Sequence, residues 1–237
     1  MKLSHFLKST SLSLAFGALA TSALAEGPMV ELNQGETISL HFIDASHSQR
    51  GEFVNTVLPS AMDDIMAAGG RMVAKFETID VEEGDVTPQH VVLMAWADDD
   101  GFNAAMDEIA PAAADLRAHT VGLFTVAQPV SFVLKDDVVY EWFAGNPAGP
   151  DTPNQLQTFF QNVIPTAMEY GRADAMLMQP VPSDHVNYPR MIAGMATWPT
   201  AASFEGFTNT DVFRTNIVEY RDPAFATLEL INTYWVE

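Results

Sequence analysis

Two ionisable side chains in β-rich segments could perform acid–base chemistry. His41 lies in the run 38–43, and Glu141 lies in the run 138–143, which has a similar order of aromatic and aliphatic residues. Aligning the two runs places His41 opposite Glu141. A histidine beside a carboxylate can act as a general base that the carboxylate orients. This role requires both side chains to face an interior that the two strands share. Otherwise they are hydrogen-bonded for structure or lie at a solvent-exposed rim.

Two arginines follow glycines that are predicted to end helices. Arg71 follows Gly70, and Arg172 follows Gly171. A guanidinium group can hold a carboxylate through two parallel hydrogen bonds, so both arginines are candidate ligand-binding residues. The alternative is a salt bridge to one of the many acidic residues of the chain.

Large aromatic residues in or beside strands favour an apolar pocket. Trp96, Trp142 and Phe143 are the candidates for its lining. Sites for small molecules are lined mainly by apolar and aromatic side chains with a few polar groups. The same residues could instead fill a solid core.

No metal or cofactor site is predicted. His41, Asp44 and His47 are close in sequence, but their spacing matches neither one face of a helix nor a zinc-binding pattern. The chain has no cysteine, which excludes disulfides, thiolate ligands and a cysteine nucleophile. It also has no glycine-rich phosphate loop and no Gly-x-Ser-x-Gly nucleophile motif.

The first 25 residues are predicted to be a signal peptide. Lys2 and Lys8 precede a short apolar stretch at 12–19, and Ala23-Leu24-Ala25 has the small-x-small pattern of a cleavage site. The apolar stretch is shorter than the roughly 20 residues that span a bilayer. We therefore expect an exported, periplasmic protein.

The excess of acidic residues excludes some classes of partner. The 237 residues include 11 Lys and Arg and 31 Asp and Glu, which gives a net charge of −20. Without residues 1–25 the charge is −22, because that segment has two lysines and no acid. Such a charge disfavours nucleic acid and anionic membrane surfaces. The expected partner is a small molecule, and the oligomeric state is open.

The two halves of the chain have the same predicted order of elements. Segments 53–63 and 159–169 match in residue type at a constant offset of 106, which indicates an internal repeat. Each half reads strand, helix, strand, strand, helix, strand. The predicted strands are 38–43, 71–81, 91–96, 121–127, 138–143, 172–179, 190–197 and 227–235. The predicted helices are 50–68, 98–118 with a break or kink at Pro111, 154–170 and 200–220.

This order is that of the ferredoxin-like unit, in which two helices cover one face of a four-stranded antiparallel sheet. The uncovered apolar faces of two such units should meet. The predicted fold class is therefore α+β, with two tandem ferredoxin-like units at residues 26–134 and 135–237 that form an intramolecular pseudo-twofold α+β barrel.

With this architecture the chain resembles the dimeric α+β barrel superfamily, which includes antibiotic-biosynthesis monooxygenase, EthD-like, NIPSNAP-like and chlorite-dismutase-like families. Local motifs resemble the bacterial domain-of-unknown-function family thirteen-thirty. They are Gly69-Gly70-Arg71 and Glu83-Gly84-Asp85 with Pro88 in the first half, and Gly171-Arg172 and Pro189-Arg190 in the second. The second half lacks Glu-Gly-Asp, and Gln89-His90 stands where the family usually has arginine. The resemblance implies the fold, whereas that family carries no established activity.

Three functions are compatible with these observations. The first is a periplasmic protein that binds a small apolar or aromatic molecule between its two sheets. The second is a cofactor-independent oxygenase or isomerase of the superfamily, with His41 as base and Glu141 or Arg71 as the orienting residue. The third is a structural or interaction module with a filled barrel.

Overall fold

The computed structural model describes residues 29–43, 58–83, 90–115, 118–126, 128–186 and 190–236. Eight strands form one closed antiparallel barrel in the order β10-β3-β4-β2-β5-β8-β9-β7. This confirms the predicted α+β barrel. No helix in these ranges is long and apolar enough to cross a membrane.

The elements follow the predicted order in both halves. The first half contains β2 (Thr37–Ile43), α2 (Leu58–Ala67), β3 (Arg71–Glu83), β4 (His90–Trp96), α3 (Asp99–Asp115) and β5 (Ala118–Val126). The second half contains β7 (Val139–Pro147), α4 (Thr152–Glu169), β8 (Ala173–Val181), β9 (Ile192–Trp198), α5 (Ala201–Thr208), α6 (Asp211–Asn216), the π-helix η2 (Ile217–Arg221), α7 (Asp222–Ala224) and β10 (Phe225–Val236).

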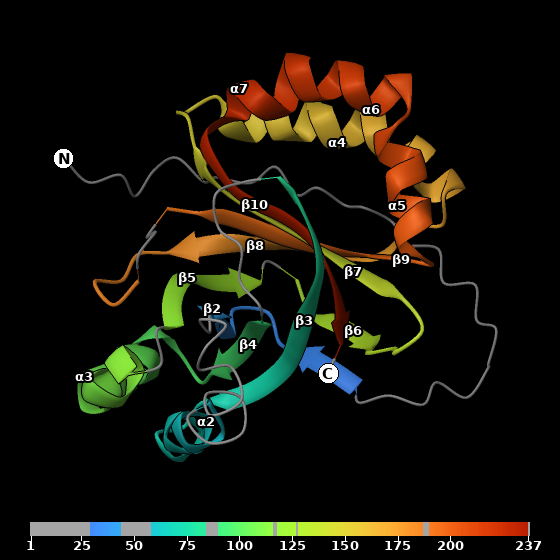
Figure 1. Ribbon diagram of the computed structural model, residues 1–237. Helices are drawn as coiled ribbons and strands as arrows, with labels where there is room; N and C mark the ends of the chain where they lie inside the picture. The colour runs from blue at the N-terminus through green and yellow to red at the C-terminus, as the bar shows by residue number, and fades with distance from the viewer. Residues whose placement is uncertain are drawn as a thin grey trace.

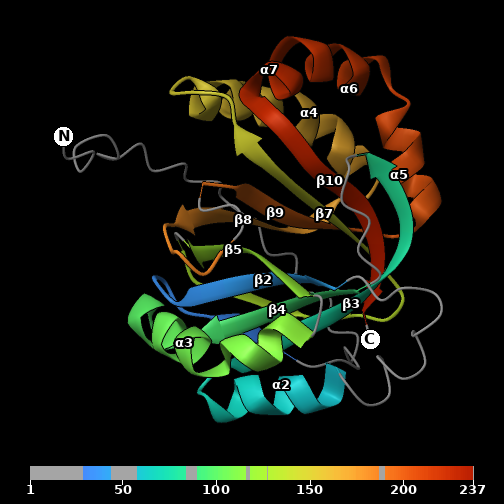
Figure 2. The same cartoon turned by 60° about the vertical axis from the view of Figure 1, so that its left-hand side comes forward.

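The strand order is the same in the two halves. It is β3-β4-β2-β5 in the first and β8-β9-β7-β10 in the second. The edges of the two sheets join through the β5–β8 and β10–β3 pairs. Figures 1 and 2 show α2 and α3 on one outer side of the barrel and α4 to α7 on the opposite side.

Large side chains fill the barrel interior. Phe76 lies within 5.1 to 6.4 Å of the rings of Tyr140, Trp142 and Tyr234, centroid to centroid, and all four residues are at most 1% exposed. We call this set the barrel core. The barrel core occupies the space between the two sheets in which a ligand pocket was expected.

Two further apolar clusters lie between the barrel and its helices. The first outer core contains Ile65, Val92, Met94, Trp96, Phe102, Ala105, Met106 and Leu123. The second outer core contains Val139, Phe159, Val163, Ala167, Trp198, Phe204 and Phe207. The strands are thus covered on both faces in each half.

Several local features differ from the sequence predictions. The ribbon of β1 (Met29–Leu32) and β6 (Val130–Val133) was not predicted, and its Val30 and Leu32 pack against the barrel core. Helix α3 continues through Pro111. The predicted helix 200–220 is divided into α5, α6 and η2.

The repeat offset also differs. Gly69 and Gly171, both with positive φ, end α2 and α4 at an offset of 102 rather than 106. Four residues are about one helical turn, so the apolar pattern still matches although the register is shifted.

Candidate ligand-binding site

The structure does not bring His41 and Glu141 together. His41 lies on β2 and Glu141 on β7, and three strands separate β2 from β7 in either direction around the barrel. Neither side chain lies in the barrel core, because Ile38, Leu40, Tyr140 and Trp142 provide the inward-facing positions of these strands. The predicted His41–Glu141 pair is therefore wrong.

His41 is a buried residue of the first half. It is 3% exposed, and its Nε2 lies 2.6 Å from Ser39 Oγ. Trp96 Nε1 donates a hydrogen bond to the same Ser39 Oγ at 2.8 Å. Burial lowers the pKa of His41 from 6.5 to about 4, so His41 is neutral when it shares this hydrogen bond with Ser39. The other two residues considered for a metal site, Asp44 and His47, lie outside the described residues.

The hydrogen bonds of two tryptophans show which positions correspond in the two halves. Trp96 donates to Ser39, and Trp198 donates to Glu141 Oε2 at 2.9 Å, each across 57 residues. Glu141 therefore corresponds to Ser39, and Phe143 corresponds to His41. The sequence alignment was two residues out of register.

The two arginines are not equivalent either. Because Gly69 and Gly171 correspond, Arg172 corresponds to Gly70. Arg71 is half exposed and forms a salt bridge with Glu36 at 2.6 Å, as the alternative interpretation of Arg71 predicted.

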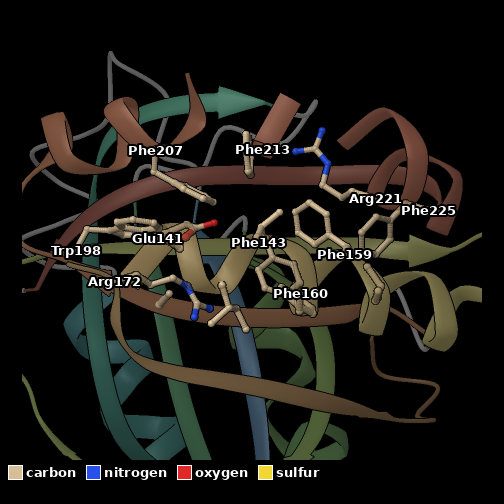
Figure 3. Close-up of a pocket in the computed structure, with 15 residues that line it drawn as sticks. Glu141, Phe143, Phe159, Phe160, Arg172, Trp198, Phe207, Phe213, Arg221 and Phe225 are labelled. Carbon is tan, nitrogen blue, oxygen red and sulfur yellow. Dashed lines mark hydrogen bonds between the residues drawn. The ribbon is translucent and has the colours of Figure 1, made fainter. Parts of the chain in front are cut away.

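Arg172 lies at a cavity in the second outer core. The cavity lies between α4 and the β7–β9 part of the sheet, with α5, α6, η2 and the start of β10 also contributing to its wall (Figure 3). Most lining residues are apolar, among them Phe143, Phe159, Phe160, Phe207 and Phe213. The cavity volume is about 50 Å³, within about 620 Å³ of unoccupied space that extends to the solvent.

Three charged side chains interrupt this apolar wall: Glu141, Arg172 and Arg221. Burial raises the pKa of Glu141, while Arg172, the hydrogen bond from Trp198 and Arg221 oppose that rise. Burial lowers the pKa of Arg172, and Glu141 opposes this shift. The site is thus a partly buried carboxylate close to two guanidinium groups, in apolar surroundings that strengthen charge interactions.

Arg221 reaches the cavity from the π-helix. Its Nε and Nη2 donate to Asp222 Oδ1 at 3.1 and 2.9 Å, and the residue is 6% exposed. A π-helical turn is rare in proteins and occurs often at functional sites. The sequence analysis missed Arg221, since no pattern in the expected helix 200–220 indicates a π-turn.

The predicted aromatic lining is divided among three places. Phe143 lines the cavity. Trp96 belongs to the first outer core, and Trp142 is fully buried in the barrel core. The other aromatic residues of the cavity lie mainly on helices. Their density in the segments 159–160 and 204–213 was the available sequence signal.

Comparisons with known proteins yield similarities of fold. No family model and no curated protein matches the sequence, so the resemblance to the family thirteen-thirty stays a prediction. A solved structure described as an anthrone oxidase-like protein aligns with a TM-score of 0.66 and 10% identity, over 89% of this chain and 94% of that chain.

More distant similarities include a mutant chlorite dismutase from Candidatus Nitrospira defluvii, with a TM-score of 0.48 and 8% identity over 85% of this chain and 92% of that one. A heme-binding protein from Thermus thermophilus aligns with a TM-score of 0.44 and 9% identity, over 89% and 94%. TM-scores at this level do not establish a shared fold. The first similarity shows the fold alone, which is the α+β barrel.

Proposed function

We propose that the protein binds a small aromatic molecule in the cavity of the second outer core. The observation that carries this proposal is a solvent-connected cavity whose wall is mostly apolar, with many aromatic side chains, and is interrupted by a few charged groups. This combination is typical of small-molecule sites. It replaces the expectation of a ligand between the two sheets, where the barrel core lies.

The size of the cavity limits the mode of binding. A volume of about 50 Å³ holds a few water molecules, whereas a cavity of about 150 Å³ accommodates benzene. An aromatic ring must therefore displace some of the phenylalanine side chains toward the solvent-connected side. Stacking of those rings on the ligand offsets the cost of moving them.

A pair of matched substitutions tests the location of the site. Ala196 lines the cavity, and Ala105 is a similarly buried alanine of the first outer core. Two neutral aromatic probes, benzyl alcohol and indole, are titrated by ligand-observed NMR. Binding to wild type and to Ala105→Leu, with loss in Ala196→Leu, supports the proposal.

Two other results contradict the proposal. Equal binding to both alanine variants would place the site elsewhere. If no probe binds, and native mass spectrometry of the protein from its own host finds no co-purified molecule, the filled barrel core favours a structural or interaction module instead.

A second candidate function is an enzyme that removes a proton from such a molecule. It is favoured by Glu141, whose Oε2 is held by Trp198 Nε1 while burial raises its pKa. A base with that environment at the edge of a cavity is suited to proton abstraction. In this reading Glu141 takes the role that the sequence analysis gave to His41.

Anthrone is a reasonable first substrate, because the fold is shared with an anthrone oxidase-like protein. Oxygen uptake with anthrone is measured for wild type and for Glu141→Gln. We expect turnover by wild type and a loss of at least roughly 100-fold in the variant. Absence of turnover by wild type contradicts the oxygenase reading, and equal turnover by both contradicts the role of Glu141.

Export to the periplasm is also part of the proposed function, on the strength of residues 1–25. The intact mass of the protein from its own host tests this. A chain that begins at Glu26 agrees with cleavage after Ala25, and a chain that retains Met1 contradicts it.

A further inference from the structure

The guanidinium group of Arg172 has no hydrogen-bond or ion-pair partner within the described part of the chain; its charge interacts only with nearby Glu141. Two other arginines differ in this respect. Arg71 is paired with Glu36, and Arg221 with Asp222. Arg172 is partly buried, and removing a guanidinium even partly from water without such a partner is costly, so its presence at the cavity requires an explanation.

The fold does not require an arginine at this position. The corresponding residue of the first half is Gly70, and a Cβ there would lie 2.9 Å from Trp96 Cη2 and 3.0 Å from Ile65 Cγ2. The same helix-to-strand turn therefore forms with no side chain at all. Arg172 is thus an addition to the second half, and it lines the cavity.

The neighbouring carboxylate is only half engaged. Glu141 Oε2 accepts the hydrogen bond from Trp198, and no hydrogen bond to Oε1 is found among the described residues. Figure 3 shows Glu141 near Trp198 and Phe207, with the Arg172 guanidinium on the α4 side of the cavity. The two charged groups thus frame one side of the cavity.

We propose that the molecule bound in this cavity carries a carboxylate that pairs with the Arg172 guanidinium, and that Glu141 takes up one proton from solvent when this molecule binds. This inference rests on the proposed function and adds the chemical class of the ligand, an aryl or arylalkyl carboxylate. Arginine suits the role because its planar donors match both oxygens of a carboxylate.

The proton uptake follows from the charges around Glu141. A second carboxylate near Arg172 faces Glu141 in an apolar cavity, and two such groups do not both stay ionised. The other charged groups that face Glu141 are Arg172 and Arg221, and Arg221 is already paired with Asp222. The lining residues that α4 contributes are all apolar. Solvent therefore supplies the proton, and the affinity for the carboxylate rises as pH falls.

The experiment compares phenylacetate with its neutral analogue phenylacetamide by isothermal titration calorimetry. The proteins are wild type, Arg172→Gln and the matched surface control Arg71→Gln. We expect wild type and Arg71→Gln to bind phenylacetate at least roughly 10-fold more tightly than phenylacetamide. Arg172→Gln should lose that preference while it still binds phenylacetamide.

Proton uptake is measured in two buffers of different ionisation enthalpy between about pH 6 and 8, where phenylacetate itself stays ionised. We expect the affinity of wild type for phenylacetate to fall up to about 10-fold for each unit by which the pH rises. This pH dependence of the affinity should vanish in Glu141→Gln. A pH-independent affinity without proton uptake overturns the role of Glu141.

The remaining outcomes separate this inference from the proposed function. Equal binding of phenylacetate and phenylacetamide to wild type overturns the carboxylate ligand but leaves an aromatic site in place. Unchanged binding of phenylacetate to Arg172→Gln overturns the role of Arg172. If neither phenylacetate nor phenylacetamide binds wild type, and benzyl alcohol and indole also fail to bind, both proposals are wrong.

Discussion

The ionisation of His41 gives the structure a pH-dependent stability that can be measured. The residue is 3% exposed, and burial lowers its pKa from 6.5 to about 4. Between these two values the unfolded chain binds a proton on His41 and the folded chain does not. Stability therefore rises with pH across this window, and it is lost as pH falls from 6.5 toward 4.

The magnitude follows from the size of the shift. A change from 6.5 to about 4 at roughly 1.4 kcal/mol per pKa unit corresponds to about 3 kcal/mol over the whole window. His41 is deeply buried, so solvent screening does not reduce this figure. Lowering the pH from about 7 to 4.5 covers most of this window and should reduce the free energy of unfolding by about 2 kcal/mol.

The substitution His41→Gln isolates this contribution. Glutamine does not titrate, and its amide can both donate and accept a hydrogen bond, so it can replace Nε2 as the partner of Ser39 Oγ. Urea unfolding of wild type and variant at about pH 7 and 4.5 gives a difference in which the titrating carboxylates cancel. We expect the variant to gain about 2 kcal/mol relative to wild type at the lower pH. An identical pH dependence for the two proteins would refute the burial of His41.

Three further predictions concern the fold. Val163→Asp places a charge in the second outer core, where Val163 is 4% exposed, and should unfold the protein at a cost of several kcal/mol; a wild-type melting temperature would contradict this assignment. Gly69→Ala should cost about 1 kcal/mol for its positive φ, and Gly171→Ala more, because its Cβ would also lie 2.6 Å from Pro199 Cγ. Equal losses of unfolding free energy in Gly69→Ala and Gly171→Ala would contradict the close approach of the Gly171→Ala Cβ to Pro199. Residues 26–134 alone should dimerise or aggregate through the uncovered barrel face; a stable monomer would show that the face is not buried.

Much of the fold was predictable from local patterns. Apolar residues at helical spacing indicated α4, and the positive-φ Gly69 ends α2 as expected for a glycine after a helix. The order of strands and helices then implied the barrel, because each ferredoxin-like sheet has one face that its own helices leave uncovered.

The position of the site was not predictable in the same way. All seven residues of β4 are buried, since one face packs in the barrel core and the other in the first outer core. Alternation of apolar and polar residues cannot assign a face to such a strand. The direction of His41 and its correspondence to Phe143 instead depend on long-range contacts such as the one between Trp96 and Ser39.

The indole N–H signals of the tryptophans test the central claim most directly. Trp198 Nε1 donates to Glu141 at the cavity, Trp96 Nε1 donates to Ser39 in the first outer core, and Trp142 lies in the barrel core. These signals are assigned by Trp→Phe substitution and followed by ¹H–¹⁵N NMR during titration with phenylacetate. The proposed site predicts a shift of the Trp198 signal while those of Trp96 and Trp142 stay in place. A shift of the Trp142 signal with Trp198 unchanged would place the ligand between the two sheets and contradict the account.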